Sequence, residues 1–225
     1  MTVRNRLVSF MKWTLGVPAF VLCSSLATAG VISATNSTTG NFDGSSGTRV
    51  VTFTGLEPGY DTGVVTDVNI SINFAKADGE GFFPPYPGGA PFYDEIRFRL
   101  THVPSAITST LIEEGSWGAG SGPFDGTITF DDAAGSVVNF GAAPVAGTFR
   151  PTGAGLLSAF NGATAAGTWS LFIEDTGGSD SLRFRTYTLN VTTVVPEPSS
   201  VSLLGIGCVG LVVSAYRRRR KLVQV

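Results

Sequence analysis

The chain has a single imidazole, that of His102, which lies beside Val103 and Pro104 at the end of a predicted strand. A Ser-His-Asp hydrolase needs an imidazole that accepts the proton of the serine. No serine here stands in a Gly-x-Ser-x-Gly motif. A zinc site needs several His or Cys ligands, and residues 30–195 hold one His and no Cys. We therefore predict that the protein is not an enzyme and that His102 is a surface turn residue.

Carboxylates occur as neighbouring pairs at the ends of predicted strands. Two carboxylates can hydrolyse a glycoside when both reach the same bond. Glu113-Glu114 and Asp131-Asp132 are adjacent in the sequence, and adjacent strand residues point to opposite faces. A hydrolase with a carboxylate site is therefore the weakest of the functional hypotheses.

Calcium is the candidate cofactor, because it prefers hard oxygen ligands supplied by carboxylates on loops. Asp131 and Asp132 lie where a strand becomes a loop, and Asp94 and Glu95 open another strand. We name Asp131, Asp132, Asp94 and Glu95 as candidate calcium ligands, with solvated acidic turns as the alternative.

The C-terminal 30 residues combine a Pro196-Glu197-Pro198 kink, an uncharged apolar run over 201–216, and a cluster of cations from Arg217 to Lys221. As a helix, 199–216 would span about 27 Å at roughly 1.5 Å per residue, close to the ~30 Å hydrocarbon core of a bilayer. The cations favour the cytoplasmic side. The sequence thus predicts a single transmembrane helix with a cytoplasmic C-terminus and the rest of the chain outside.

These residues resemble the PEP-CTERM sorting signal of bacteria that produce exopolysaccharide. The resemblance rests on Pro196, Glu197 and Pro198, the short apolar helix, and Arg217, Arg218, Arg219 and Arg220. It implies that an exosortase in the membrane processes the tail near Pro-Glu-Pro and that the body leaves for the cell surface or matrix. The alternative is a permanent single-span anchor.

The N-terminus predicts export as well. Arg4, Arg6 and Lys12 form a basic region before an apolar core over 13–26. Ala27 and Ala29 give the small-x-small pattern that signal peptidase recognises, so we expect cleavage before Gly30. An uncleaved N-terminal anchor is the alternative; lipoprotein processing at Cys23 is rejected because Ser24 follows it.

The body that remains, 30–195, holds seven basic and sixteen acidic residues, a net charge near −9, whereas the whole chain carries −2. This charge argues against nucleic-acid binding, which requires a basic patch. Both cysteines, Cys23 and Cys208, lie in the terminal apolar segments, so the body must fold without disulfides. A body of this length can bury a sufficient core unaided.

Short segments with a period of two run through the body. Val68, Ile70, Ile72 and Phe74 alternate with polar residues, as in a half-buried strand. The same pattern recurs over 93–101, 106–112, 127–132 and 167–174, and a shift of phase near Arg185 and Thr186 predicts a bulge. No long segment has a helical period. The expected fold is all-β, an antiparallel β-sandwich.

A series of motifs in the body resembles the P domain, the jelly-roll module behind the catalytic domain of proprotein convertases and many bacterial subtilases. The motifs are Thr129-Phe130-Asp131-Asp132-Ala133, Gly147-Thr148-Phe149-Arg150-Pro151, Leu157-Ser158-Ala159-Phe160-Asn161-Gly162, Gly167-Thr168-Trp169-Ser170-Leu171 and Tyr187-Thr188-Leu189-Asn190-Val191. The resemblance covers 64–193 and implies a jelly roll, often with calcium. Tyr187 and the Pro-rich loop over 82–91 depart from it. Phe130, Phe149, Phe160 and Trp169 are expected core residues.

The predicted organisation is a signal peptide (1–29), a flexible lead-in (30–48), a P-domain-like sandwich (49–193) and the PEP-CTERM signal (194–225). The expected partners are signal peptidase, an exosortase, the membrane before tail processing, and extracellular polysaccharide. We expect a structural, adhesive or polysaccharide-binding protein at the cell surface or in the matrix. The alternative function is an accessory P domain that assists a separate secreted subtilisin-like protease.

Overall fold

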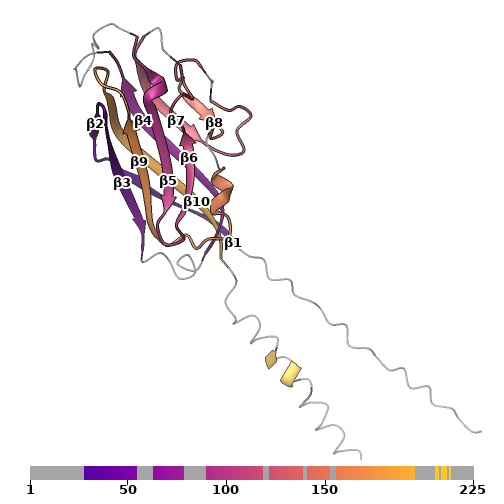
Figure 1. Ribbon diagram of the computed structural model, residues 1–225. Helices are drawn as coiled ribbons and strands as arrows, with labels where there is room; N and C mark the ends of the chain where they lie inside the picture. The colour runs from indigo at the N-terminus through magenta and orange to yellow at the C-terminus, as the bar shows by residue number, and fades with distance from the viewer. Residues whose placement is uncertain are drawn as a thin grey trace, which may run out of the picture.

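The computed structural model describes residues 28–54, 63–78, 90–118, 122–138, 141–152 and 156–195, together with 206, 207, 209–211 and 213. The strands between residues 28 and 195 form two β-sheets that face each other (Figure 1). The larger sheet has the order β1 (Thr28–Asn36), β10 (Leu182–Val195), β4 (Val64–Lys76), β7 (Phe124–Phe130) and β8 (Gly147–Phe149), and β2 (Gly40–Phe42) also pairs with β10. The smaller sheet has the order β3 (Ser45–Phe53), β9 (Gly167–Asp175), β5 (Ile96–His102) and β6 (Ile107–Ile112).

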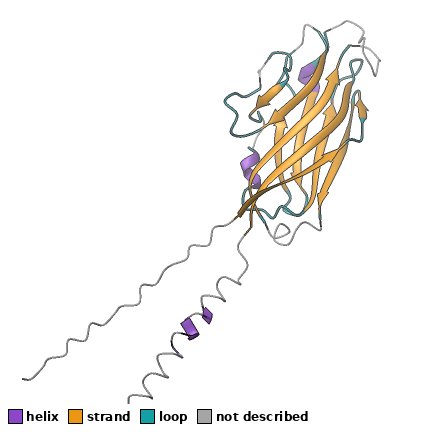
Figure 2. Cartoon of the chain, turned by 180° about the vertical axis from the view of Figure 1, so that it is seen from behind, coloured by secondary structure: helices purple, strands orange, loops and turns teal. Residues whose placement is uncertain are grey.

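Among the described residues of the body, helical structure is confined to two short 3-10 turns, η1 (Tyr93–Glu95) and η2 (Leu157–Phe160), which lie beside the sheets (Figure 2). The prediction of an all-β, two-sheet body is therefore confirmed. Its antiparallel pairing holds throughout the described strands except for β7 and β8, which pair in parallel over three residues.

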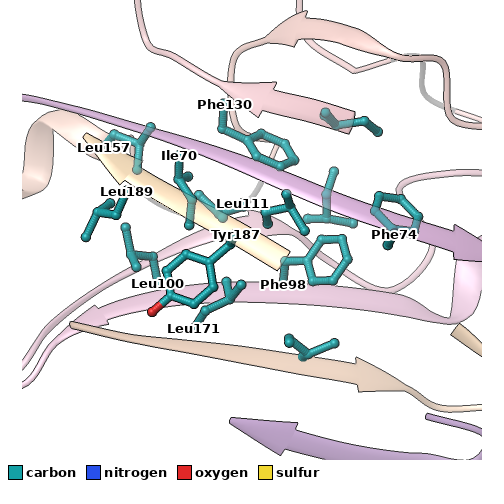
Figure 3. Close-up of a cluster of buried hydrophobic side chains, with 14 of the residues drawn as sticks. Ile70, Phe74, Phe98, Leu100, Leu111, Phe130, Leu157, Leu171, Tyr187 and Leu189 are labelled. Atoms are coloured by element: carbon teal, nitrogen blue, oxygen red, sulfur yellow. The ribbon is translucent and has the colours of Figure 1, made fainter. Parts of the chain in front are cut away.

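The two sheets face each other across one core, to which the apolar residues of each strand contribute (Figure 3). From β4, Val68, Ile70, Ile72 and Phe74 are fully buried, and β9 contributes Trp169, Leu171 and Ile173. Because side chains alternate between the two faces of a strand, each sheet presents one apolar face to the other. Phe130, Phe160 and Trp169 are core residues as expected, and Phe149 is partly buried against them.

The bulge expected in the last strand is present. The register of β10 against β4 shifts between Phe184 and Thr186, so Phe184 and Tyr187 both face the core and are buried. An extra residue at this point bends the strand and changes the phase of its side chains.

The flexible lead-in predicted for 30–48 is wrong. Residues 28–36 form β1, which pairs with β10 along its whole length, and 40–53 contribute β2 and β3. Gly47 allows close packing in this segment, because a Cβ there would lie 2.6 Å from the ring of Phe42. The segment is poor in apolar residues because β1 is an edge strand, and the side chains of Ser33 and Thr35 on its outer face are exposed.

Trp169 links the sandwich to η2. Its ring lies 4.9 Å from that of Phe160 and 4.4 Å from that of His102, and its Nε1 donates to the carbonyl of Ala165 at 3.1 Å. We expect Trp169→Ala to lower the free energy of unfolding by about 3–5 kcal/mol, the usual cost of truncating a buried Trp. Urea denaturation would measure this. Phe92→Ala, at an exposed aromatic, is the control and should cost less than about 1 kcal/mol; equal losses in the two variants would contradict the assignment.

Candidate functional site

The strongest concentration of charge inside the sandwich surrounds Lys76. Its Nζ lies 2.7 Å from Asp175 Oδ2, 3.2 Å from Glu95 Oε2 and 3.4 Å from Asp180 Oδ1. The side chains of Lys76 and Asp175 are fully buried, that of Asp180 is nearly so, and that of Glu95 is about a quarter exposed. One ammonium group therefore serves three carboxylates in a medium that screens charge poorly. We call these four residues the Lys76 cluster.

Four separate segments supply the Lys76 cluster. Lys76 ends β4 in the larger sheet, and Asp175 ends β9 in the smaller one. Glu95 ends η1, and Asp180 lies in the turn that joins β9 to β10. The cluster thus connects the two sheets at the end where β10 begins.

Backbone amides donate hydrogen bonds to two of these carboxylates. Asp175 Oδ2 also accepts from the N–H of Leu182 at 2.9 Å, and Asp180 Oδ2 accepts from the N–H of Phe92 at 2.5 Å. Asp175 Oδ1 is buried and has no hydrogen-bond partner among the described residues. Such an oxygen favours the protonated acid, since burial of an unpaired charge is costly.

The pKa values in the Lys76 cluster reflect this environment. Burial raises the pKa of Asp175 to about 7, although Lys76 and the Leu182 amide oppose the rise. Burial also raises the pKa of Glu95, again against the influence of Lys76. Both shifts favour the protonated acids, because loss of a proton would add a negative charge to an already acidic site.

The carboxylate oxygens of Glu95, Asp175 and Asp180 lie within 4.8 Å of one another. Within the part of the chain that the structure describes, no other group of three or more His, Cys, Asp or Glu side chains comes as close together. Calcium does not fit this group, because Lys76 Nζ contacts all three carboxylates and takes the place of a cation. A metal ion would have to displace a buried ammonium. The Lys76 cluster is better explained as an internal ion-pair network.

The four predicted calcium ligands are not brought together. Only Glu95 belongs to the group just described. Asp132 uses both carboxylate oxygens to accept from the amides of Leu157 and Ser158, at 3.0 and 2.7 Å, and so caps η2. Asp131 Oδ1 accepts from the amide of Ala133 at 2.7 Å in a tight turn. Asp94 supplies its carbonyl to the amide of Gly115. These contacts give Asp131 and Asp132 local structural roles.

The prediction that His102 is a surface residue is wrong. His102 is fully buried at the end of β5. Its Nε2 lies 3.2 Å from the carbonyl of Ala166 and must donate to it, so in the neutral ring Nδ1 accepts from Ser105 Oγ at 2.8 Å. Burial lowers the pKa of His102, which keeps the ring neutral. Ser105 and His102 resemble the nucleophile and base of a catalytic triad, but the other ring nitrogen, Nε2, bonds to a backbone carbonyl and not to the usual carboxylate.

Glu113 and Glu114 do not form an acid-base pair either. Arg97 binds both, at 3.2 and 2.8 Å, and also binds Glu174 at 2.5 Å. This network lies on the outer face of the smaller sheet, where such pairs contribute little stability individually.

Sequence reasoning missed Lys76, Asp175 and Asp180. For two of them a signal was present. Lys76 continues the buried series that ends with Phe74, and Asp175 continues the series that ends with Ile173. A polar residue in phase with a buried stripe predicts a buried, partnered charge. Asp180 lies in a turn and follows no such series.

The end of the sandwich opposite the Lys76 cluster holds both ends of the body. β1 pairs with β10 so that Thr28 lies opposite Val195, Ala29 opposite Val194 and Gly30 opposite Thr193. The predicted signal-peptidase site and the start of the sorting signal therefore lie on neighbouring strands. Residues 1–27 and 196–205, with Pro196, Glu197 and Pro198, lie outside the described residues, as do Arg217, Arg218, Arg219 and Arg220.

Residues 194–221 match the family model of the PEP-CTERM protein-sorting motif. The sorting signal is thus confirmed, and it supports export of the chain, passage through the membrane and processing by an exosortase. Of the predicted transmembrane helix, 206, 207, 209–211 and 213 are described and are helical. No helix within the described ranges is long and apolar enough to cross a membrane.

Solved structures give distant likenesses. A crystal structure of FLHE matches with a TM-score of 0.37 and 14% identity, covering 75% of this chain and 99% of that one. A chain in the crystal structure of the Aeromonas sobria serine protease (ASP) and chaperone (ORF2) complex matches with a TM-score of 0.39 and 11% identity, covering 76% of this chain and 28% of that one. Neither score carries an argument about function. Comparison with curated proteins gave no match.

Removal of the Lys76 ammonium should leave three carboxylates in the interior without a cation. We expect Lys76→Met to lower the free energy of unfolding by about 3–5 kcal/mol, the typical cost of removing one partner of a buried pair. Arg99→Met is the matched control, because Arg99 pairs with Glu113 at a partly exposed site and should cost about 0–1 kcal/mol. Denaturant titration of both variants measures the difference. A loss below about 1 kcal/mol for Lys76→Met would show that the cluster contributes little.

The raised pKa of Asp175 predicts a pH dependence of stability. The folded state binds this proton more tightly than the unfolded chain, whose Asp pKa is near 3.8. Its contribution is therefore fully present below pH 3.8 and is lost as the pH rises through about 7. His102, whose folded pKa lies below 6.5, acts in the opposite direction, because its contribution is lost as the pH falls.

A variant isolates the effect of Asp175. Between pH 5 and 8, Asp175→Asn should remove a fall of several degrees in melting temperature that the unmodified protein shows, since about 1 kcal/mol corresponds to roughly 2–4 °C in a domain of this size. Asp43→Asn, at an exposed loop carboxylate, should leave the fall in place. Identical pH profiles for the unmodified protein and Asp175→Asn would contradict the prediction.

Proposed function

We propose that this chain is an exported, non-catalytic β-sandwich protein, displayed at the cell surface or in the extracellular matrix as a structural or adhesive component that binds polysaccharide. The observation that carries the proposal is the junction between body and signal. The sorting motif covers 194–221, and β10 ends at Val195. The folded body therefore continues directly into the segment that an exosortase processes.

The geometry of the body supports display from one end. β10 has 14 residues and at about 3.3 Å per residue extends over roughly 45 Å. Its last residues lie beside the start of β1, whereas its first residues lie beside the Lys76 cluster. A body attached through its C-terminus would hold the Lys76 cluster away from the membrane. The outer face of the larger sheet would then form one side of the displayed body.

The non-catalytic part of the proposal rests on how the polar groups are used. His102 is buried against Trp169, the Glu113-Glu114 pair is bound by Arg97, and the buried carboxylates surround Lys76. Each of these described groups already has a structural partner. The resemblance of 64–193 to the P domain, and its jelly-roll topology, belong to the same proposal.

Processing of the ends tests the proposal. In cells that carry the exosortase, intact-mass analysis should find an extracellular species beginning at Gly30 and ending near Pro196. Replacement of Arg217, Arg218, Arg219 and Arg220 by Ser should cause retention or mis-sorting, because these charges orient the segment in the membrane. Replacement of the same four residues by Lys preserves the charge and should preserve the orientation.

Unchanged export of the Ser variant would contradict the sorting role. A body that is exported but always purifies with a secreted subtilisin-like protease would instead favour the accessory P-domain hypothesis.

A further inference from the structure

The outer face of the larger sheet carries a row of hydroxyl groups across five strands. Thr35 of β1 lies opposite Thr188 of β10, Thr188 opposite Ser71 of β4, Ser71 opposite Thr129 of β7, and Thr129 opposite Thr148 of β8. All five side chains are exposed or half-buried. We call these five residues the hydroxyl row.

Hydrogen bonds across the strands hold four of these five hydroxyl groups in place. Thr35 Oγ1 lies 2.9 Å from Thr188 Oγ1, and Ser71 Oγ lies 2.8 Å from Thr129 Oγ1. Each hydroxyl can donate once and accept twice, so every pair keeps donor and acceptor capacity toward solvent. Short side chains that are already paired lose little rotamer entropy when they bind a partner.

Neutral polar rows flank the hydroxyl row on both sides. On one side Ser33, Asn190 and Asn69 lie opposite one another, with a 2.7 Å bond from Ser33 Oγ to Asn190 Oδ1. On the other side, Asn73 lies between Thr186 and Thr127 and donates from Nδ2 to Thr127 Oγ1 at 2.9 Å. The three rows together contain no charged residue and no aliphatic or aromatic residue.

The outer face of the smaller sheet is different. Its centre carries Arg97 and Arg99 of β5 and Glu174 of β9, joined in ion pairs with Glu113 and Glu114. On the larger sheet, Asp67, Asp125 and Arg185 lie at the margins of the three rows, and the other charged residues of its described strands, Lys76 and Arg183, are buried. The smaller sheet also has hydroxyl pairs, Thr52–Thr168 and Thr101–Thr108, but they share their face with the ion-paired residues of that sheet. The three rows of the larger sheet are neutral throughout, although the body as a whole is acidic.

The spacing of the hydroxyl row suits an extended polymer of sugars. Neighbouring strands lie about 4.8 Å apart, a distance close to the length of one sugar unit in an extended glycan. A glycan chain that runs across the strands would meet one protein hydroxyl for each sugar along five strands. The flanking rows, about 7 Å away along the strands, would reach its lateral hydroxyls.

We propose that the three rows of this face bind a neutral polysaccharide whose chain lies across the strands. The net charge of the body, near −9, opposes an anionic glycan, a nucleic acid or an anionic membrane surface. A second copy of the chain would need apolar area to bury on this face, and the three rows offer none. The hydroxyl groups of the protein and those of a neutral polysaccharide can each donate and accept hydrogen bonds, so the two surfaces are complementary.

This inference rests on the proposed function, because it names the ligand class and the surface for the proposed polysaccharide binding. The full chain is expressed with its own sorting signals, and the protein recovered after export is tested by affinity electrophoresis. The gels contain dextran, laminarin or hydroxyethyl cellulose as neutral probes, or alginate as an anionic probe. We expect retardation by at least one neutral probe and none by alginate.

Paired variants locate the binding surface. Thr188→Lys with Thr129→Lys places two long charged side chains in the hydroxyl row and should weaken binding at least tenfold. The matched control is Thr101→Lys with Thr52→Lys on the smaller sheet, where Thr101 and Thr52 face Thr108 and Thr168 in similar hydroxyl pairs. The control should bind like the unmodified protein, and near-identical melting temperatures of both variants show that the fold is intact.

Three results would overturn the inference. These are no retardation by any neutral probe, stronger retardation by alginate, or equal binding by the two paired variants. If the protein is nevertheless found outside the cell with processed ends, its export and display stand and only this surface assignment fails.

Discussion

The ion pair between Lys76 and Asp175 is the constraint on which one end of the sandwich depends. It joins β4 of the larger sheet to β9 of the smaller one at 2.7 Å, with both side chains fully buried. Neither charge would be stable in the interior alone, so the two sheets must meet in one register at this point. Asp180 brings the β9–β10 turn to the same ammonium, and Glu95 brings the start of β5. A network of this kind favours a single arrangement of the four segments. Apolar residues specify an arrangement less strictly, because they can be interchanged in a core.

The opposite end is organised by aromatic packing and by the ends of the chain. Trp169 packs between Phe160 and His102, and the neutral ring of His102 fastens the β5–β6 turn through Ser105. At this end β1 and the last residues of β10 pair in register, so both predicted processing sites belong to one pair of strands. Complete pairing of β1 requires β10, the strand that ends where the sorting segment begins.

The two outer faces give the sandwich different surfaces. The smaller sheet presents an ion-pair network around Arg97, whereas the larger sheet presents hydrogen-bonded hydroxyl and amide groups around Ser71 and Thr188. Threonine and serine alternate with core residues along the same strands. In these strands, one set of alternating residues therefore forms the core and the other set forms the neutral surface.

Alternation along the sequence determined which residues face the core, because a strand places every second side chain on the same side. This is why β4, β5 and β9, the bulge at Arg185 and the burial of Trp169 could be predicted. The sorting signal was recognisable from its own residues. The same alternation runs on to Lys76, His102 and Asp175, but it cannot say which strand lies opposite. The partners of those three residues come from distant segments, as Lys76 and Asp175 are 99 positions apart in the sequence, and only the packing of one sheet on the other brings them together. The hydroxyl row was likewise decided by register between strands, since each of its members is an ordinary polar residue until its neighbours are known.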